Sequence, residues 1–302
     1  MLCSCSGGKK AITKLEDKQY QTSVYKDKFV GEDLCVVSSD IPLETFGNTE
    51  SFQSVALFDI TDKKVWLASD MHEKLFPAST TKVLTLYVAL KYGNLADNVT
   101  VSSNATGVPS DSSVAGLLLG DSLTLKDLLY GMMLPSGNDA AVAVAEHIAG
   151  STEEFVTLMN KEATLLGATN SNFVNPHGYH DEGHYTTAYD LYLIFNEAIK
   201  NETFCEIINS DKYTTNITDS NGSQRSVTWN QSNKYINGDT TVPEGLNVVG
   251  GKTGTTMKAG SCLTLYVKDS EEKSYIAIIM GAVTRDDLYV NMSKLLSAIE
   301  GL

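Results

Sequence analysis

The chain has 302 residues, enough to bury a substantial core in one large domain or two subdomains. It carries 23 Lys and Arg against 37 Asp and Glu, and this net charge of −14 argues against nucleic acid or a polyanionic surface as a partner. Its longest apolar runs, such as residues 275–283, fall well short of the roughly 18 to 20 residues that span a bilayer, so we expect no transmembrane helix.

Five cysteines are too few and too scattered for a disulfide framework. Cys35, Cys205 and Cys262 have apolar neighbours and are predicted to be buried thiols. Cys3 and Cys5 lie in residues 1–23, a polar, lysine-rich stretch predicted to be a flexible tail. The sequence around them is similar to the end of a bacterial lipoprotein signal, in which a cysteine is lipidated, although the preceding hydrophobic run is missing. Either Cys3 or Cys5 is a lipid anchor, or the similarity is accidental.

Taken in chain order, residues 55–60 and 64–68 predict a β-hairpin. A helix begins near Ser79, and residues 94–120, rich in Ser, Gly, Asn and Asp, predict a loop with short turns. Apolar residues with helical spacing predict further helices at residues 124–133, 138–149, 153–166, 188–200 and 286–300. Two more strands are expected at residues 262–268 and 275–283. The order indicates an α/β (α+β) fold, in which N- and C-terminal segments form one antiparallel sheet and residues 95–245 form a mainly helical insertion.

Ser79 and Lys82 are three positions apart in the sequence, so both lie on one face where this helix begins. A serine becomes a good nucleophile when a nearby base takes its proton, and an amine is such a base only when its surroundings keep it neutral. Ser79 also lies near the positive end of the helix dipole, which favours a developing negative charge. Taken alone, the pair is better explained as an N-cap serine followed by a surface lysine.

Two later motifs favour the catalytic interpretation of Ser79 and Lys82. Ser136-Gly137-Asn138 precedes a predicted helix and alone would be an N-cap turn; the Lys252-Thr253-Gly254-Thr255 stretch alone would be a β-turn. Ser-x-x-Lys, Ser-x-Asn and Lys-Thr-Gly follow in this order with gaps of roughly 55 and 115 residues, a combination typical of serine β-lactamases and penicillin-binding proteins.

Further segments narrow the resemblance: Asn175-Pro176-His177-Gly178, residues 184–188 and residues 259–263. With the three motifs, they make residues 50–290 similar to the D-alanyl-D-alanine carboxypeptidases, the low-molecular-mass penicillin-binding proteins. The resemblance implies a β-lactamase/transpeptidase-like catalytic domain over residues 24–302, without a C-terminal accessory domain. Tyr189 differs from the family pattern, because relatives often carry a basic residue at this position. The substrate contact that such a residue would make is therefore not predicted for this chain.

The resemblance implies that Ser79 attacks the carbonyl between two terminal D-alanines of a peptidoglycan stem peptide, with Lys82 as the base. Lys82 would be kept neutral by burial and by the charge of Lys252. Ser136 would relay the proton to the leaving amine, and Asn138 would orient Lys82 and the substrate amide.

It also implies that Lys252, with the hydroxyls of Thr253 and Thr255, holds the substrate carboxylate. The backbone N–H groups of Ser79 and Thr255 would form the oxyanion hole. Gly254 is expected to leave space for substrate beside the strand. β-Lactams would inhibit the enzyme, no cofactor is required, and the protein would act on the cell-wall side of the membrane.

Three histidines, His177, His180 and His184, lie within eight residues, so a metal site is an alternative for that segment. We favour a structural loop below the active site, since the segment has no helical ligand spacing.

Two other functions remain open. A serine β-lactamase typically has a Glu-x-x-Leu-Asn segment between the second and third motifs; here only Glu197 and Asn201 have related spacing, on a predicted ordinary helix. A non-catalytic penicillin-sensing module would also retain Ser79 and Lys82, but such a sensor is normally fused to a transmembrane or signalling segment.

Overall fold

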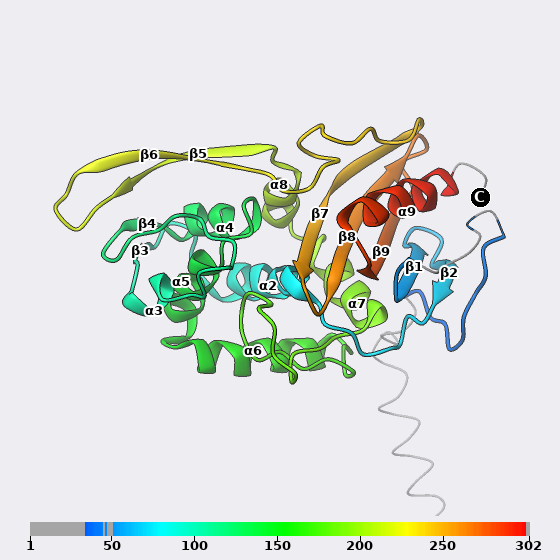
Figure 1. Ribbon diagram of the computed structural model, residues 1–302, viewed down its shortest axis with the longest axis horizontal. Helices are drawn as coiled ribbons and strands as arrows, with labels where there is room; N and C mark the ends of the chain where they lie inside the picture. The colour runs from blue at the N-terminus through cyan, green and yellow to red at the C-terminus, as the bar shows by residue number, and fades with distance from the viewer. Residues whose placement is uncertain (1–33, 45, 47–50, 300–302) are drawn as a thin grey trace, which may run out of the picture.

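The computed structural model describes residues 34–44, 46 and 51–299 (Figure 1). The tail with Cys3 and Cys5 lies outside these residues. An antiparallel sheet with strand order β2-β1-β9-β8-β7 joins the two ends of the chain, as the sequence predicts. Its strands are β1 (Ser54–Asp59), β2 (Lys64–Ser69), β7 (Leu246–Thr256), β8 (Gly260–Asp269) and β9 (Ser274–Ala282).

The sheet is covered on both faces, which explains the continuous apolar run in β9. Ile276, Ile278 and Met280 pack into the core shared with the helical part, whereas Ala277 and Ile279 pack under α9 (Arg285–Ser297). Because side chains alternate along a strand, a strand buried on both faces has few polar positions. Figure 1 shows α9 on one face of the sheet and α7 (Ala188–Ala198) on the other side.

The remaining helices form the larger part of the molecule beside the sheet. The predicted helices are confirmed, with ends displaced by a few residues. Capping residues determine where several of these helices begin. Thr124 and Asp127 form a capping box at the start of α4, and Ser151 accepts a hydrogen bond from the Glu154 N–H at the start of α6. The predicted helices of this part are α2 (Lys82–Tyr92), α4 (Leu125–Met133), α5 (Asn138–Ala149) and α6 (Thr152–Leu165). A further helix, α8 (Glu202–Asn209), was not predicted.

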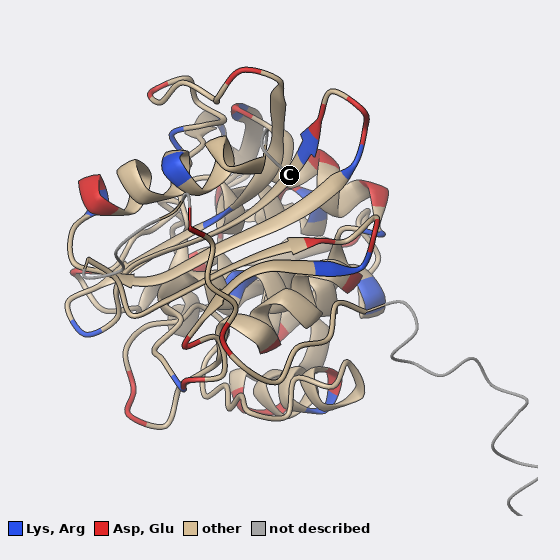
Figure 2. Ribbon diagram, turned by 90° about the vertical axis from the view of Figure 1, so that its right-hand side faces the viewer, with Lys and Arg blue, Asp and Glu red and all other residues tan. Residues whose placement is uncertain are grey.

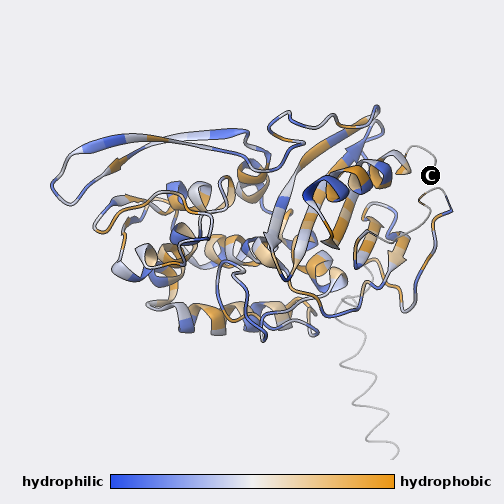
Figure 3. Ribbon diagram, in the orientation of Figure 1, coloured by the Kyte–Doolittle hydropathy of each residue, from blue (hydrophilic) through white to orange (hydrophobic). Residues whose placement is uncertain are grey.

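A second sheet, with strand order β3-β4-β5-β6, was not predicted. Residues 94–120, expected to form a loop, contain one of its strands and a short helix. The longest strands of this sheet form an arm over α4, much of it hydrophilic in colour (Figure 3). The arm is held by Tyr213, which stacks on Tyr130 with ring centroids 3.8 Å apart. The additional elements are β3 (Asn98–Thr100), α3 (Ser103–Thr106), β4 (Ser122–Thr124), β5 (Lys212–Thr218) and β6 (Gln224–Asn230).

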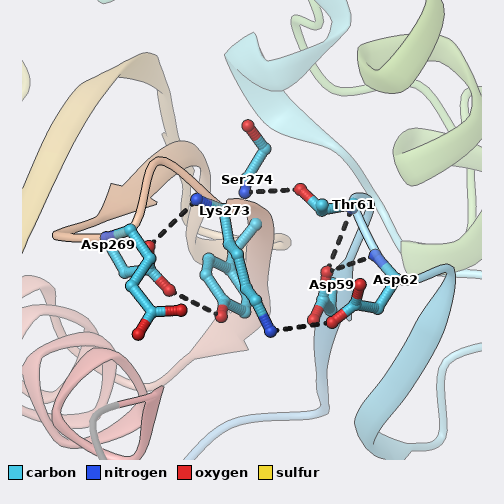
Figure 4. A network of polar contacts seen from close by, with 8 residues as sticks. Asp59, Thr61, Asp62, Asp269, Lys273 and Ser274 are labelled. Carbon is cyan, nitrogen blue, oxygen red and sulfur yellow. Dashed lines mark hydrogen bonds and ion pairs between the residues drawn. The ribbon is translucent and has the colours of Figure 1, made fainter.

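Two turns at one end of the main sheet are tied together by polar contacts (Figure 4). Lys273, before β9, forms an ion pair of 2.8 Å with Asp62, which follows β1. The Ser274 N–H donates to Thr61 Oγ1 over 2.8 Å. These contacts fix the β1–β2 turn against the β8–β9 turn.

Charged residues lie mainly in turns and on exposed helix surfaces, while the strands of the main sheet carry few of them (Figure 2). No helix among the described residues is long and apolar enough to cross a membrane. Cys35 and Cys262 are buried as predicted, but Cys205 is only half-buried, because its position on α8 lies at the edge of the helical core.

Candidate active site

Ser79 lies on a 3-10 turn, Ala78–Thr81, that leads directly into α2. The predicted helix start was therefore slightly early: the α-helix proper begins at Lys82. The turn is braced by its own hydroxyls, since Thr80 Oγ1 donates to the Pro77 carbonyl at 2.7 Å and Thr81 Oγ1 to the Ala78 carbonyl at 2.8 Å. Ala78 has a φ of 48°, an unfavourable value for a residue with a Cβ. The backbone that presents Ser79 is thus strained and held from several sides.

The Lys82 amine is completely buried and has three close neighbours. Its Nζ lies 2.7 Å from Asn138 Oδ1, 2.8 Å from the His177 carbonyl oxygen and 3.1 Å from Ser79 Oγ. Burial, followed by the positive charge of Lys252, holds the pKa of Lys82 well below its usual value. A neutral amine has two N–H bonds and one lone pair. Because Asn138 and His177 offer only acceptors, they take the two N–H bonds, and the lone pair faces the Ser79 hydroxyl.

Ser136 and Lys252 form the second polar pair. Lys252 is buried, and its Nζ donates to Ser136 Oγ at 2.9 Å and to the Thr253 carbonyl at 3.1 Å. Burial, with a smaller contribution from the charge of Arg285, lowers the pKa of Lys252 to about 7. Ser136 has a φ of 66°, so it is a second strained residue of the site. The contact joins the turn before α5 to β7.

Gly254 is required by the packing of the protein itself, a reason for this glycine that sequence reasoning did not supply. A Cβ on Gly254 would lie 2.7 Å from the Ser79 backbone nitrogen and 3.0 Å from the Pro77 carbonyl oxygen. The strand therefore packs directly against the turn that carries Ser79. Thr253, expected among the carboxylate ligands, places its hydroxyl 3.1 Å from Ser232 Oγ.

A cleft of about 450 Å³ opens over Ser79. Asn138 and Thr255 reach its wall, and β7 borders it as the edge strand of the main sheet. Gly178 and His180, both singled out from the sequence, also line the cleft. Sequence reasoning missed the other lining residues, which have no catalytic signature: Asp111, Ser112, Ser113, Tyr179, Thr256, Met257 and Lys258.

The histidine-containing loop packs below the turn that carries Ser79. His184 accepts from the Val174 N–H through Nδ1 at 3.2 Å, so its Nε2 carries the proton and donates to Thr81 Oγ1 at 2.8 Å. Both of its ring nitrogens are thus engaged with the protein. Burial lowers the pKa of His177 to about 3 and that of His184 to about 4. In the part of the chain that the structure describes, no group of three or more His, Cys, Asp and Glu residues is arranged to hold a metal ion.

Asp139 is a supporting residue that sequence reasoning missed. Its buried carboxylate accepts backbone N–H groups of Ala115, Gly116 and Leu117 at 2.7, 3.0 and 3.0 Å. These contacts fix one wall of the cleft to the start of α5. Its place directly after Asn138, in the first turn of a helix, was the only sequence signal available.

Two other residues singled out from the sequence lie elsewhere. Tyr189 donates to the Cys35 carbonyl at 3.0 Å and packs against His72, so it is not among the residues that line the cleft. Glu197 and Asn201 line a separate cavity with Tyr87 and Lys91. The spacing that resembled a β-lactamase motif therefore does not place a carboxylate beside Ser79.

Comparisons with a family model and with curated relatives point to the same family. A family model described as D-alanyl-D-alanine carboxypeptidase matches residues 47–284. D-alanyl-D-alanine carboxypeptidase DacF of Bacillus subtilis is 35% identical over 250 residues, covering 81% of this chain and 61% of the relative. DacC of Escherichia coli is also 35% identical over 250 residues, covering 80% of this chain and 59% of the relative.

Solved structures show the same fold. The Streptomyces K15 DD-transpeptidase superposes with a TM-score of 0.78 at 28% identity, covering 84% of this chain and 99% of that chain. This similarity confirms the predicted β-lactamase/transpeptidase-like fold. The chain spans about three fifths of the length of the curated relatives it matches. It belongs to the D-alanyl-D-alanine carboxypeptidase family.

Proposed function

We propose that the chain is a serine-type D-alanyl-D-alanine carboxypeptidase, which removes the terminal D-alanine from peptidoglycan stem pentapeptides through an acyl-enzyme. The observation that carries this proposal is the Lys82 amine: it is buried, has a lowered pKa, and lies 3.1 Å from Ser79 Oγ with its N–H bonds directed to other acceptors. An amine so placed is the base that a serine nucleophile needs.

In the acylation step, Ser79 Oγ attacks the carbonyl carbon between the two D-alanines while Lys82 takes the hydroxyl proton. The backbone N–H groups of Ser79 and Thr255 stabilise the negative charge on the carbonyl oxygen. The proton then passes through the Ser136 hydroxyl to the amine of the departing D-alanine, as the carbon–nitrogen bond breaks. Support for this relay is that Ser136 is held by the buried Lys252, at 2.9 Å.

Substrate binding depends on the charge of Lys252, which attracts the terminal carboxylate together with the hydroxyls of Thr253 and Thr255. Thr255 lines the cleft directly; Thr253 is buried and acts beside it on the same strand face. Asn138 holds Lys82 through Oδ1, at 2.7 Å, and its amide nitrogen contacts the substrate backbone.

In the deacylation step, water attacks the ester carbonyl and Lys82 accepts the water proton. Lys82 then returns this proton to Ser79 Oγ as the ester bond breaks, so that the Ser79 hydroxyl and the neutral amine are both regenerated. β-Lactam antibiotics acylate the same oxygen, but their bulky acyl group blocks the approach of water. They therefore act as inhibitors.

The substrate lies on the outer side of the cytoplasmic membrane, so we place the protein on the cell-wall side, with a lipid on Cys3 or Cys5 as its membrane tether. Mass spectrometry of the native N-terminus tests the tether. A lipid-sized mass increase on either cysteine is expected, and an unmodified N-terminus would refute it.

The proposed activity is tested by following D-alanine release from a pentapeptide ending in D-Ala-D-Ala. We expect catalytic release by the native chain, none by Ser79→Ala, and inhibition by benzylpenicillin. Hydrolysis of penicillin without release of D-alanine would favour a β-lactamase, and acylation without turnover of either compound would favour a penicillin-sensing module.

A further inference from the structure

Asp111 is a cleft residue to which the reaction gives no role. Among the described residues that line the cleft, it is the only one with a carboxylate. It lies on the wall formed by residues 111–113, and none of the ion pairs among the described residues includes it. Asp111 therefore borders the cleft without an ion-pair partner among the described residues; Lys258 lines the same cleft but forms no ion pair with it.

The segment that carries Asp111 is held in place. The Ser112 N–H and hydroxyl both bond to the Pro109 carbonyl, at 3.0 and 2.6 Å, which closes a turn around Asp111. The Asn138 N–H donates to the Ser113 carbonyl at 2.8 Å. Asp139 anchors residues 115–117, as described above. Asp111 is thus tied to the same helix start that carries Asn138, and its position relative to the site is fixed.

The Asp111 carboxylate is also oriented. The Tyr179 hydroxyl donates to Oδ1 at 3.0 Å from the opposite wall of the cleft, and this contact raises the pKa of Tyr179. Oδ2 has no partner among the described residues, so it can accept a hydrogen bond from a ligand. An oriented carboxylate with one free oxygen suits an ammonium group.

A stem peptide can supply such a group. In a stem peptide whose third residue is a diamino acid, that residue directly precedes the acylated D-alanine, and adjacent Cα atoms are about 3.8 Å apart. When Ser79 reaches the D-alanine carbonyl, that diamino residue must also lie in or at the mouth of the cleft. Its flexible side chain can then bring the amino group to the cleft wall.

We propose that Asp111 is a specificity-determining residue that binds the free side-chain ammonium of the third stem residue, so that the enzyme prefers stem peptides in which this amine is uncapped. This inference rests on the proposed carboxypeptidase function. The preference is electrostatic and concerns substrate choice, while Ser79 and Lys82 perform the chemistry.

The test uses two peptides, Nα-acetyl-L-Lys-D-Ala-D-Ala and its Nε-acetylated form, and compares kcat/KM for D-alanine release. A partly exposed ion pair corresponds to a preference of about three- to fivefold for the free amine. Asp111→Asn should bring the ratio close to one while preserving the Tyr179 contact. Asp111→Lys should reverse the preference, and high salt should reduce it in the native chain.

Two control variants separate charge from structure. Tyr179→Phe removes the contact that orients the carboxylate but keeps the charge, so it should lower the ratio less than Asp111→Asn does. Asp286→Asn removes one exposed charge on α9 and should retain the native ratio. An unchanged ratio in Asp111→Asn, or equal use of the two peptides by the native chain, would overturn this inference alone. Release from neither peptide by the native chain would overturn the proposed function, and this inference with it.

Discussion

Gly254 and Ser79 are in direct backbone contact: a Cβ added to Gly254 would lie only 2.7 Å from the Ser79 nitrogen. The third motif of the chain therefore sets the position of the first. Because that nitrogen is one of the two proposed oxyanion donors, even a small displacement of the turn should affect acylation more than folding.

Gly254→Ala tests this relationship. We expect acylation of Ser79 by a fluorescent penicillin to slow by about ten- to a hundredfold, since misplacement by about 1 Å has effects of this size. Stability should fall by about 1–3 kcal/mol from overpacking. Gly222→Ala is the matched control: its φ is 82° and nothing lies within 4 Å of the added Cβ, so it should lose about 1 kcal/mol through backbone strain yet label normally. Equal labelling rates in the two variants would refute the positioning role of Gly254.

The pH dependence of kcat/KM should report Lys252. The free enzyme needs this group protonated to attract a carboxylate, and its pKa is lowered to about 7 by burial and by Arg285. We therefore expect kcat/KM for D-alanine release to decline above about pH 7, approaching a tenfold loss for each further pH unit. A bound carboxylate favours the charged form, so kcat should decline only at higher pH.

Two variants test whether Lys252 causes the decline in kcat/KM above about pH 7. In Lys252→Arg, the guanidinium cannot deprotonate in this pH range, so the decline in kcat/KM should disappear. The activity of this variant will be lower, because a guanidinium differs in geometry from an ammonium group. Arg285→Gln removes a nearby positive charge and should move the decline to higher pH. If the native decline persisted unchanged in both variants, another group would be responsible.

Asp139→Asn should loosen the wall of the cleft. An amide can replace one carboxylate oxygen, but its NH₂ group would face N–H donors of residues 115–117. Leaving buried donors unpaired costs about 1–3 kcal/mol, so thermal unfolding should occur at lower temperature. Asp219→Asn is the control, because Asp219 also accepts backbone N–H groups but lies in an exposed turn. A similar loss in both variants would contradict the special role of the buried carboxylate.

The sequence predicted the parts of the site that are local or that depend on side-chain type. Ser79 and Lys82 could be paired because three residues along one helical turn bring side chains together. Four strands of the main sheet were predictable too, since β1 and β2 form a hairpin and β8 and β9 are apolar on both faces. β7 was not, because its Lys252–Thr255 stretch alone indicates only a turn. The assembly of β8 and β9 with β1 followed from the order of strands and helices along the chain.

Other features had no sequence signal. The His177 group that holds Lys82 is a backbone carbonyl, which any residue could supply. The arm formed by β5 and β6 was missed because much of its surface is polar, and its apolar contacts, such as Tyr213 on Tyr130, join residues far apart in the chain. The steric reason for Gly254 was missed because the packing of β7 against the Ser79 turn is a tertiary contact.

The most direct test of the central claim, that Ser79 is the nucleophile activated by Lys82 in a carboxypeptidase, is intact-protein mass spectrometry after mixing with benzylpenicillin. We predict one penicilloyl adduct, located on Ser79, that persists while unlabelled enzyme releases D-alanine from peptide. Ser79→Ala should show no adduct, and Lys82→Ala should form it far more slowly. An adduct on another residue, or rapid penicillin turnover with no adduct and no D-alanine release, would contradict the account.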